Sequence, residues 1–295
     1  MLSDILTMGL NGLIWSMSTF IVAAGLTLVF GILHVLNFSH GGFFMIGAYV
    51  ACSVLQWMGG DHGIVLYLIA ALAGGIVVGA AGLFVDFTVF RRLQDQDGTY
   101  VLIATYALLL LCGGAVKFIW GLNYQAVDPP RELQDIWMIG DAFIPTFSVF
   151  VILSGLAIYL VLEWGLYHTR LGKMLEAIAM DPWMARVMGI NVSLVYQCTI
   201  VAGFALAGFG GGLLLANQSL SPDLAHIFIL QGFGVVIVGG MGSVRGAFIA
   251  SLLLGALEIV SSLILPDYPG VLFFCAIALT LLFRPQGLMG REVHS

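Results

Sequence analysis

The sequence predicts an all-α, polytopic helical membrane protein with about eight to ten transmembrane helices, some of them short or broken. Of its 295 residues, 60% are hydrophobic and only 9% are charged, against roughly 25% charged residues in soluble domains. Apolar stretches recur along the whole chain, and the mean hydropathy is +1.06. The one long polar interruption lies at residues 170–191. Together these observations exclude a soluble globular protein.

Nine apolar stretches mark the predicted spans, against the ~20 residues that a helix needs to cross a bilayer. They are residues 5–33, 43–57, 64–90, 100–120, 146–166, 193–216, 225–241, 246–265 and 271–283. The first has room for a break near Gly25, while the second, seventh and ninth are short and flanked by Gly or Pro. Short or broken segments are tolerated at membrane depth only where they face protein or a wet cavity. We therefore expect residues 1–295 to form a single transmembrane domain.

The distribution of charge predicts how the chain is oriented, because cytoplasmic loops collect Lys and Arg. If the N-terminus lies outside and nine helices follow, only Lys117 and Arg131 of the ten basic residues fall outside. Acidic residues then gather on the outer segments, so the net charge of −6 is an outward acidic excess and no nucleic-acid partner is expected. Residues 1–4 lack the basic region of a cleavable signal, so we expect the first span to be retained. The C-terminus is predicted to be cytoplasmic.

The polar segment 170–191 is predicted to lie on the cytoplasmic side and to contact another protein. It carries three of the ten basic residues, Arg170, Lys173 and Arg186. Its second half has the signals of a short helix: Asp181 suits the N-cap, Pro182 the first helical position and Gly189 the residue just past the end. Two turns are too few to be stable alone in water. We therefore expect this helix to need a partner surface.

Signatures of enzymes and metal sites are missing from the sequence. The four cysteines lie inside predicted spans with no CxxC pair, and the six histidines show neither metal-binding spacing nor an HExxH motif. The stretch around Lys173 lacks the upstream glycine and the Ser/Thr of a phosphate-binding loop, and Ser243 is not followed by the glycine of a nucleophile motif. We expect no enzymatic activity, no metal and no cofactor bound by this chain. If ATP drives the protein, the ATP is bound by another chain.

Glycine is unusually frequent, with 38 residues, about twice the ~7% average. Much of it has helical four-residue spacing, which lets backbones approach closely within lipid. One interpretation is tight helix packing inside the chain, and the other is a subunit interface or a mobile gate. The second interpretation places these glycines against a second chain: Gly203, Gly208, Gly211 and Gly212.

Three polar patches are candidates for lining a transport path. Asn37, Ser39 and His40 interrupt the first two apolar stretches, either as a loop at the inner surface or as an unwound segment lining the path. Asn217 and Gln218 follow a long span at its outer side, where a surface loop is the alternative. Glu258 lies within the eighth span, and intramembrane carboxylates are costly and usually face a bundle interior or water. Its alternative is a hydrogen-bonded structural carboxyl.

Four motifs in order resemble a known family, the inner-membrane permeases of branched-chain amino acid ABC importers. The resemblance covers residues 25–49, 172–191, 238–247 and 284–291, and so extends over nearly the whole chain. One departure is Gly42, where many relatives carry Glu. Related permeases also serve urea, short amides and aromatic compounds, so this departure weakens the assignment to one substrate.

The resemblance implies a bacterial inner-membrane importer that pairs two permease chains with two cytoplasmic ATPases and a periplasmic binding protein. ATP and Mg would be bound by the ATPases. Segment 170–191 then matches the coupling helices that seat in an ATPase groove, with Lys173, Met174, Glu176, Asp181, Arg186 and Gly189 as the contact residues. The second permease is expected to be a related chain, with a homodimer as the alternative. The rival class is a self-sufficient secondary transporter, but Glu258 is alone where a coupling-ion site needs clustered acids.

Overall fold

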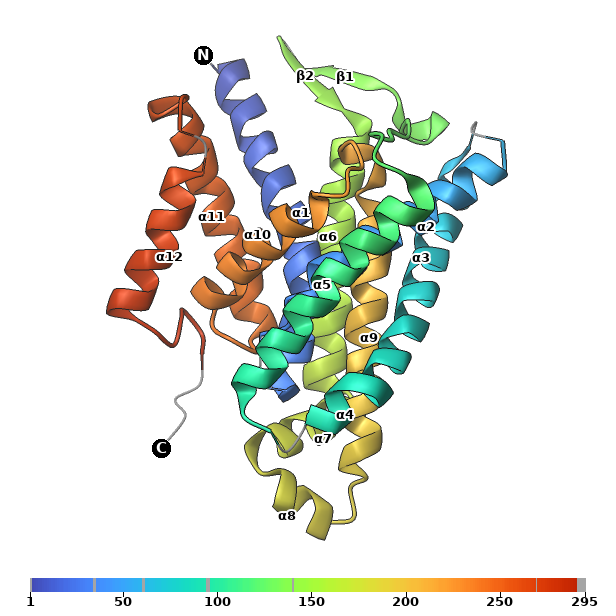
Figure 1. Cartoon of the computed structure of the whole chain (residues 1–295). Coiled ribbons are helices and arrows are strands. Elements are labelled where there is room, and N and C mark those ends of the chain that lie inside the picture. Colours follow the sequence, from blue (N-terminus) through green and yellow to red (C-terminus); the bar gives the residue numbers. More distant parts are fainter. Residues whose placement is uncertain are drawn as a thin grey trace.

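The computed structural model describes residues 2–33, 36–59, 62–93, 96–139, 141–268 and 270–290, and it is almost wholly helical (Figure 1). The first half contains α1 (Leu2–Leu33), α2 (Ser39–Trp57), α3 (Ile64–Val85), the π-helix η1 (Asp86–Phe90), α4 (Arg91–Leu93) and α5 (Gly98–Trp120). A loop then carries the 3-10 helix η2 (Arg131–Leu133) and the strands β1 (Ile136–Ile139) and β2 (Ala142–Pro145). The second half contains α6 (Thr146–His168), α7 (Arg170–Met180), α8 (Pro182–Val187), α9 (Val192–Leu213), the 3-10 helix η3 (Leu215–Asn217), α10 (Leu224–Gly239), α11 (Val244–Ile264) and α12 (Val271–Phe283).

The helices confirm the predicted class, a polytopic helical membrane protein. Within the described ranges, six helical stretches are long and apolar enough to cross a membrane: α1, α3 with its extension to Leu93, α5, α6, α9 and α11. The other apolar helices are α2, with 19 residues, α10, with 16, and α12, with 13. These three are the second, seventh and ninth stretches of the sequence, which were predicted to be short.

The first helix is continuous from Leu2 to Leu33, so the break expected near Gly25 is wrong. A Cβ atom placed on Gly25 would lie 2.7 Å from the carbonyl oxygen of Gly203 on α9. Gly25 therefore lets α1 approach another helix instead of interrupting α1.

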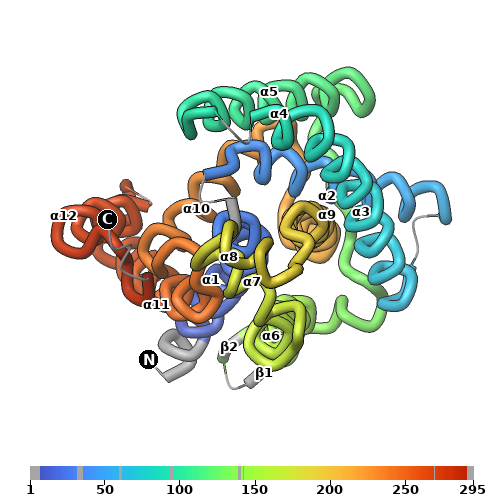
Figure 2. Tube along the Cα trace, turned by 90° about the horizontal axis from the view of Figure 1, so that it is seen from below, coloured from blue at the N-terminus to red at the C-terminus, as the bar shows by residue number. Residues whose placement is uncertain are grey.

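Helices α1 and α9 lie at the centre of the bundle, and the other long helices surround them (Figure 2). The apolar side chains between Phe20 and Leu26 on α1 are almost completely buried. Helices α5 and α6, by contrast, bury the smallest share of their spans. Their outward apolar side chains suit contact with membrane lipid, which is as apolar as they are.

Three helices cross at three glycines. A Cβ on Gly74 of α3 would lie 2.6 Å from the carbonyl oxygen of Gly47 on α2, and a Cβ on Gly208 of α9 would lie 2.6 Å from the carbonyl oxygen of Gly74. No side chain fits at such distances, so the glycines permit backbone-to-backbone packing inside this chain.

The expected subunit interface along α9 is therefore wrong. Gly203, Gly208, Gly211 and Gly212 are all buried. Gly203 packs against Val29 of α1, Gly211 against Phe44 of α2, and Gly212 against Ala71 of α3. A glycine covered by its own chain cannot also contact a second one.

The loop before α6 and the helices α7 and α8 lie at opposite ends of the bundle (Figure 1). The loop contains an antiparallel hairpin in which Trp137 pairs with Ile144, an element that the sequence analysis did not anticipate. A backbone bridge between Gln125 and Leu220 ties this loop to the connection between α9 and α10. Helix α1 begins at the hairpin end.

Candidate functional site

Helices α7 and α8 (residues 170–187), called the protruding helix pair below, project from one end of the bundle (Figure 1). They connect the end of α6 to the start of α9. A Cβ on Gly172 would overlap the carbonyl group of Leu166, so the turn from α6 into α7 has room only for glycine.

Each helix of the pair has a side-chain cap. The Thr169 hydroxyl accepts a hydrogen bond from the Gly172 N–H at 3.2 Å, and the Asp181 carboxylate accepts hydrogen bonds from the N–H groups of Trp183 and Met184, each at 2.9 Å. Pro182 occupies the first turn of α8, and Gly189 follows the helix with φ +84°, a conformation that favours glycine. The helix signals of the second half of segment 170–191 are thus confirmed.

Helix α7 was not predicted, although the sequence contains a signal for it. Leu171, Met174, Leu175 and Ile178 follow the i, i+3, i+4, i+7 spacing of an amphipathic helix, and Thr169 stands at the N-cap position. Charged residues stand between these apolar positions, and they make the periodicity harder to recognise in the sequence.

The protruding helix pair has a small hydrophobic core of its own. Ile178 of α7, Ala185 of α8 and Val192 of α9 are buried together, and Ile190, Val195 and Tyr196 pack against them. This core is separate from the main core of the bundle. The two-turn helix α8 is therefore supported by its own chain, and not only by a partner as the sequence analysis expected.

The outer face of the protruding helix pair is apolar. Five large apolar side chains are exposed at the end of α7 and along α8: Met180, Trp183, Met184, Val187 and Met188. Trp183 is 68% exposed and Met188 is 75% exposed. The pair lies between the candidate spans of α6 and α9 and is part of neither. Exposed apolar patches on such elements mark interaction sites.

The polar residues expected to contact an ATPase occupy the same pair. Lys173, Glu176, Asp181, Arg186 and Gly189 are exposed, and Met174 is half-buried. The Asp181 carboxylate is already engaged as the cap of α8. The exposed apolar residues were not predicted from the sequence, although large apolar side chains on a helix too short to bury them are a signal for such a face.

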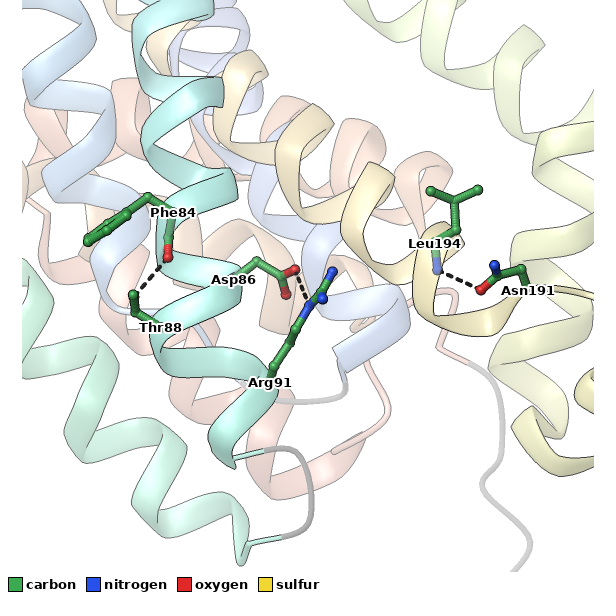
Figure 3. A network of polar contacts seen from close by, with 6 residues as sticks. All are labelled: Phe84, Asp86, Thr88, Arg91, Asn191 and Leu194. Carbon is green, nitrogen blue, oxygen red and sulfur yellow. Dashed lines mark hydrogen bonds and ion pairs between the residues drawn. The ribbon is translucent and has the colours of Figure 1, made fainter.

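A partly buried ion pair lies where α3 ends beside the start of α9 (Figure 3). Arg91 donates from Nε to the Asp86 carboxylate at 3.0 Å, and Asp86 is 3% exposed. Asp86 begins the π-helix η1, a local irregularity that is frequent at functional sites. On the neighbouring helix, the side chain of Asn191 caps α9 by accepting from the Leu194 N–H at 3.1 Å.

A second ion pair joins α6, which runs into the protruding helix pair, to α11. Arg245 donates from Nε to Glu163 at 2.7 Å and also from Nη2. Its guanidinium carbon lies 4.0 Å from the centre of the Tyr167 ring, a cation–π geometry. Movement of α6 is thereby linked to α11.

The candidate path residues are not all brought together. Asn37, Ser39 and His40 are buried side by side at the start of α2, where Ser39 and His40 are already helical. Asn217 and Gln218 lie beyond the end of α9, at the hairpin end. Glu258 is half-buried on α11, near the backbone of Gly270. Only the first group forms a cluster.

The bundle of long apolar helices defines a polytopic membrane protein. The chain belongs to the family described as branched-chain amino acid transport system / permease component, whose profile matches residues 8–282. It is thus a transport permease, and the resemblance found in the sequence is confirmed.

Individual relatives align with this chain over most of their length. The permease protein LivH of the high-affinity branched-chain amino acid transport system of Escherichia coli K12 is 30% identical over 292 residues, which cover 95% of this chain and 94% of LivH. BraD of Pseudomonas aeruginosa is 31% identical over the same shares of both chains. LivM of E. coli K12, also named as a permease protein of that system, is 26% identical over 91% of this chain and 67% of LivM.

Proposed function

We propose that this chain is one of two permease subunits of an ATP-driven importer that moves branched-chain or other hydrophobic amino acids across the bacterial inner membrane. The observation that carries the proposal is the apolar face of the protruding helix pair, on a chain whose relatives are named as amino acid permeases. Urea, short amides and aromatic compounds are the alternative substrates.

The apolar face supports docking to a separate ATPase. The sequence has no phosphate-binding loop, so the energy of ATP must enter through another chain. A short helix that presents apolar anchors at i, i+3 and i+4 suits a hydrophobic groove on a partner. Met184, Val187 and Met188 have this spacing. Trp183 and Met188 are the most exposed apolar side chains from Pro182 to Met188, while Lys173, Glu176 and Arg186 form the polar rim.

The Glu163–Arg245 pair supports transmission of movement from that groove into the membrane. Because α6 continues into the protruding helix pair, a pull on α8 acts on α6 and, through Arg245, on α11. ATP binding shifts the permease between two access states only if the ATPases bind one state more tightly than the other.

A second permease is proposed because one chain offers one protruding helix pair, whereas an ATPase dimer presents two grooves. LivH and LivM of one bacterium are both similar to this chain, which supports a pair of related but different permeases. A homodimer is the other outcome. Either partner must use a face other than the buried glycines of α9.

The two ends of the bundle receive different partners in this proposal. The protruding helix pair faces the cytoplasmic ATPases, and the hairpin end, where α1 begins, faces the periplasm and the substrate-binding protein. This orientation agrees with the distribution of Lys and Arg in the sequence.

The proposal is tested by reconstituting the chain with its second permease, the ATPases and the binding protein, and by measuring leucine uptake into liposomes. We expect uptake to require ATP and the binding protein. Trp183→Ser combined with Met188→Ser should leave the permease inserted but abolish co-purification of the ATPases. Leu194→Ser, at an exposed position on α9, is the matched control.

Two results would contradict the proposal. Normal substrate-stimulated ATP hydrolysis in the double variant would show that the apolar face is not the docking site. Leucine uptake by the chain alone, driven by an ion gradient, would favour the secondary transporter.

A further inference from the structure

We infer that Asn37 and His40 bind the charged head of an amino acid as it passes through the permease. The inference rests on the proposed function and adds the residues that touch the substrate. It starts from unsatisfied polar atoms in the interior of the bundle.

Three nitrogen atoms at the start of α2 have no hydrogen bond of good geometry among the described residues: Asn37 Nδ2, His40 Nδ1 and His40 Nε2. The polar group beside the His40 ring is the backbone of Val22 on α1. Asn37 is 1% exposed and His40 is fully buried. A buried polar group without a partner is destabilising, because it has lost its hydrogen bonds to water. Such groups are uncommon in folded proteins, and each calls for an explanation.

The orientation of Asn37 follows from its neighbours. Its Oδ1 accepts from the Ser39 N–H at 3.1 Å and from the Ser39 hydroxyl at 2.6 Å. A backbone N–H can only donate, so the atom that faces Ser39 is the amide oxygen. The NH₂ group of Asn37 is therefore left as a free donor.

The surroundings of these atoms are apolar and aromatic. The His40 ring meets the Phe204 ring edge-on at 6.4 Å, and Phe43 packs against Phe204 at 4.6 Å. Phe38 meets Phe233 of α10 at 4.9 Å. A few convergent polar groups within an apolar shell are typical of sites for small ligands.

This arrangement suits a hydrophobic amino acid. Asn37 Nδ2 is a donor for a carboxylate. The His40 imidazole, once α1 with Val22 has moved away, supplies one further nitrogen for the same charged head. The positive end of α2 also favours the carboxylate. The aromatic rings would contact the substrate side chain.

The site is closed in this conformation. A Cβ on Gly25 of α1 would lie 2.8 Å from His40 Cε1, so α1 packs directly on the imidazole. Binding requires α1 and α9 to separate from α2, and the movement of the two access states in the proposed cycle supplies that separation.

The test uses Asn37→Leu and His40→Leu in the fully assembled transporter, with radiolabelled leucine delivered by the binding protein. We expect leucine uptake to fall at least tenfold in each variant. The thermal midpoint of the His40→Leu complex should stay the same or rise, because a buried polar ring has been replaced by an apolar side chain. Asn37→Leu also removes the oxygen that accepts from Ser39, so its midpoint should fall, and its uptake is compared with wild type well below that midpoint. Ser261→Ala, on α11, is the control. It removes a different buried polar group without a partner, a hydroxyl, and should leave uptake unchanged.

Two results would overturn the inference. Unchanged uptake in both variants would show that these groups do not touch the substrate. Reduced uptake with a lower thermal midpoint in both would assign them a structural role. If the unmodified complex fails to take up leucine, the proposed function fails, and the inference fails with it. If the wild-type complex transports leucine, the proposed function holds, and the two variants then test the inference alone.

Discussion

Asp181 and Met184 are joined by a 2.9 Å hydrogen bond in which the Met184 backbone N–H donates to the Asp181 carboxylate. With the bond from the Trp183 N–H, it caps the first turn of α8, which carries the exposed side chains of Trp183 and Met184. One residue thus sets the geometry of the apolar face that we propose for ATPase docking.

Loss of this cap should weaken docking without unfolding the bundle. Asp181→Ala removes an N-cap, which is worth about 0.5–2 kcal/mol, and α8 has little else to hold it apart from Ala185 in the small core. We expect a roughly 2- to 30-fold lower affinity for the ATPases in a pull-down titration. Asp181→Ser, which keeps a capping oxygen, should restore most of it. Equal affinity in the Ala and Ser variants would show that the cap is irrelevant to docking.

Gly208→Ala should destabilise the chain itself. The added Cβ would lie 2.6 Å from both the Gly74 carbonyl oxygen and Val78 Cβ, and overpacking a core costs about 1–3 kcal/mol. The measurement is the thermal midpoint of the purified chain without partners. Gly113→Ala on α5, where nothing lies within 4 Å, is the control and should be neutral or stabilising. Similar midpoints for the two variants would argue against the three-helix crossing.

The Glu163–Arg245 pair should behave as one unit. Arg245→Ala leaves Glu163 Oε1 without its donor, and Oε2 has no partner in the described structure. We therefore expect Arg245→Ala and Glu163→Gln each to lower the thermal midpoint, with the double variant losing less than the two losses added together. Strictly additive losses would mean that the two side chains do not interact in the membrane.

The cap of α5 should depend on pH. Hydrogen bonds from the side chain and then the backbone of Thr99 lower the pKa of the Asp97 carboxyl below its ordinary value, which is about 3.9. The charged cap therefore stabilises the fold fully above that value and is lost as the pH falls through the folded-state pKa. The thermal midpoints of wild type and Asp97→Asn should differ at neutral pH and converge in acid. A constant difference would contradict this assignment.

The sequence predicted the helices well because lipid leaves few alternatives. A backbone that crosses a membrane must satisfy its own hydrogen bonds, so a long apolar stretch is read as a helix. The ends of α8 could be predicted equally well, since Asp181 as N-cap, Pro182 in the first turn and Gly189 after the helix each follow from the local preference of one residue.

The partners of the glycines could not be read in the same way. Four-residue spacing shows that a helix face is small, but the contact of Gly208 with Gly74 depends on a fold that brings together residues far apart in the chain. The break near Gly25 was wrongly anticipated for a similar reason, because glycine permits both a break in a helix and the close approach of a second helix. The polar path candidates stay in the groups that the sequence already shows, and the structure does not bring Asn37 to His40, Asn217 with Gln218, and Glu258 into one site.

Photo-crosslinking from position 183 tests the central claim, that the protruding helix pair docks on an ATPase. Benzoylphenylalanine replaces Trp183 in membranes that contain the whole transporter, and a second sample carries it at Trp164, an equally exposed tryptophan on the span of α6. We expect an ATPase adduct from position 183 and none from position 164. A transporter that imports leucine yet gives no ATPase adduct from position 183 would contradict the claim.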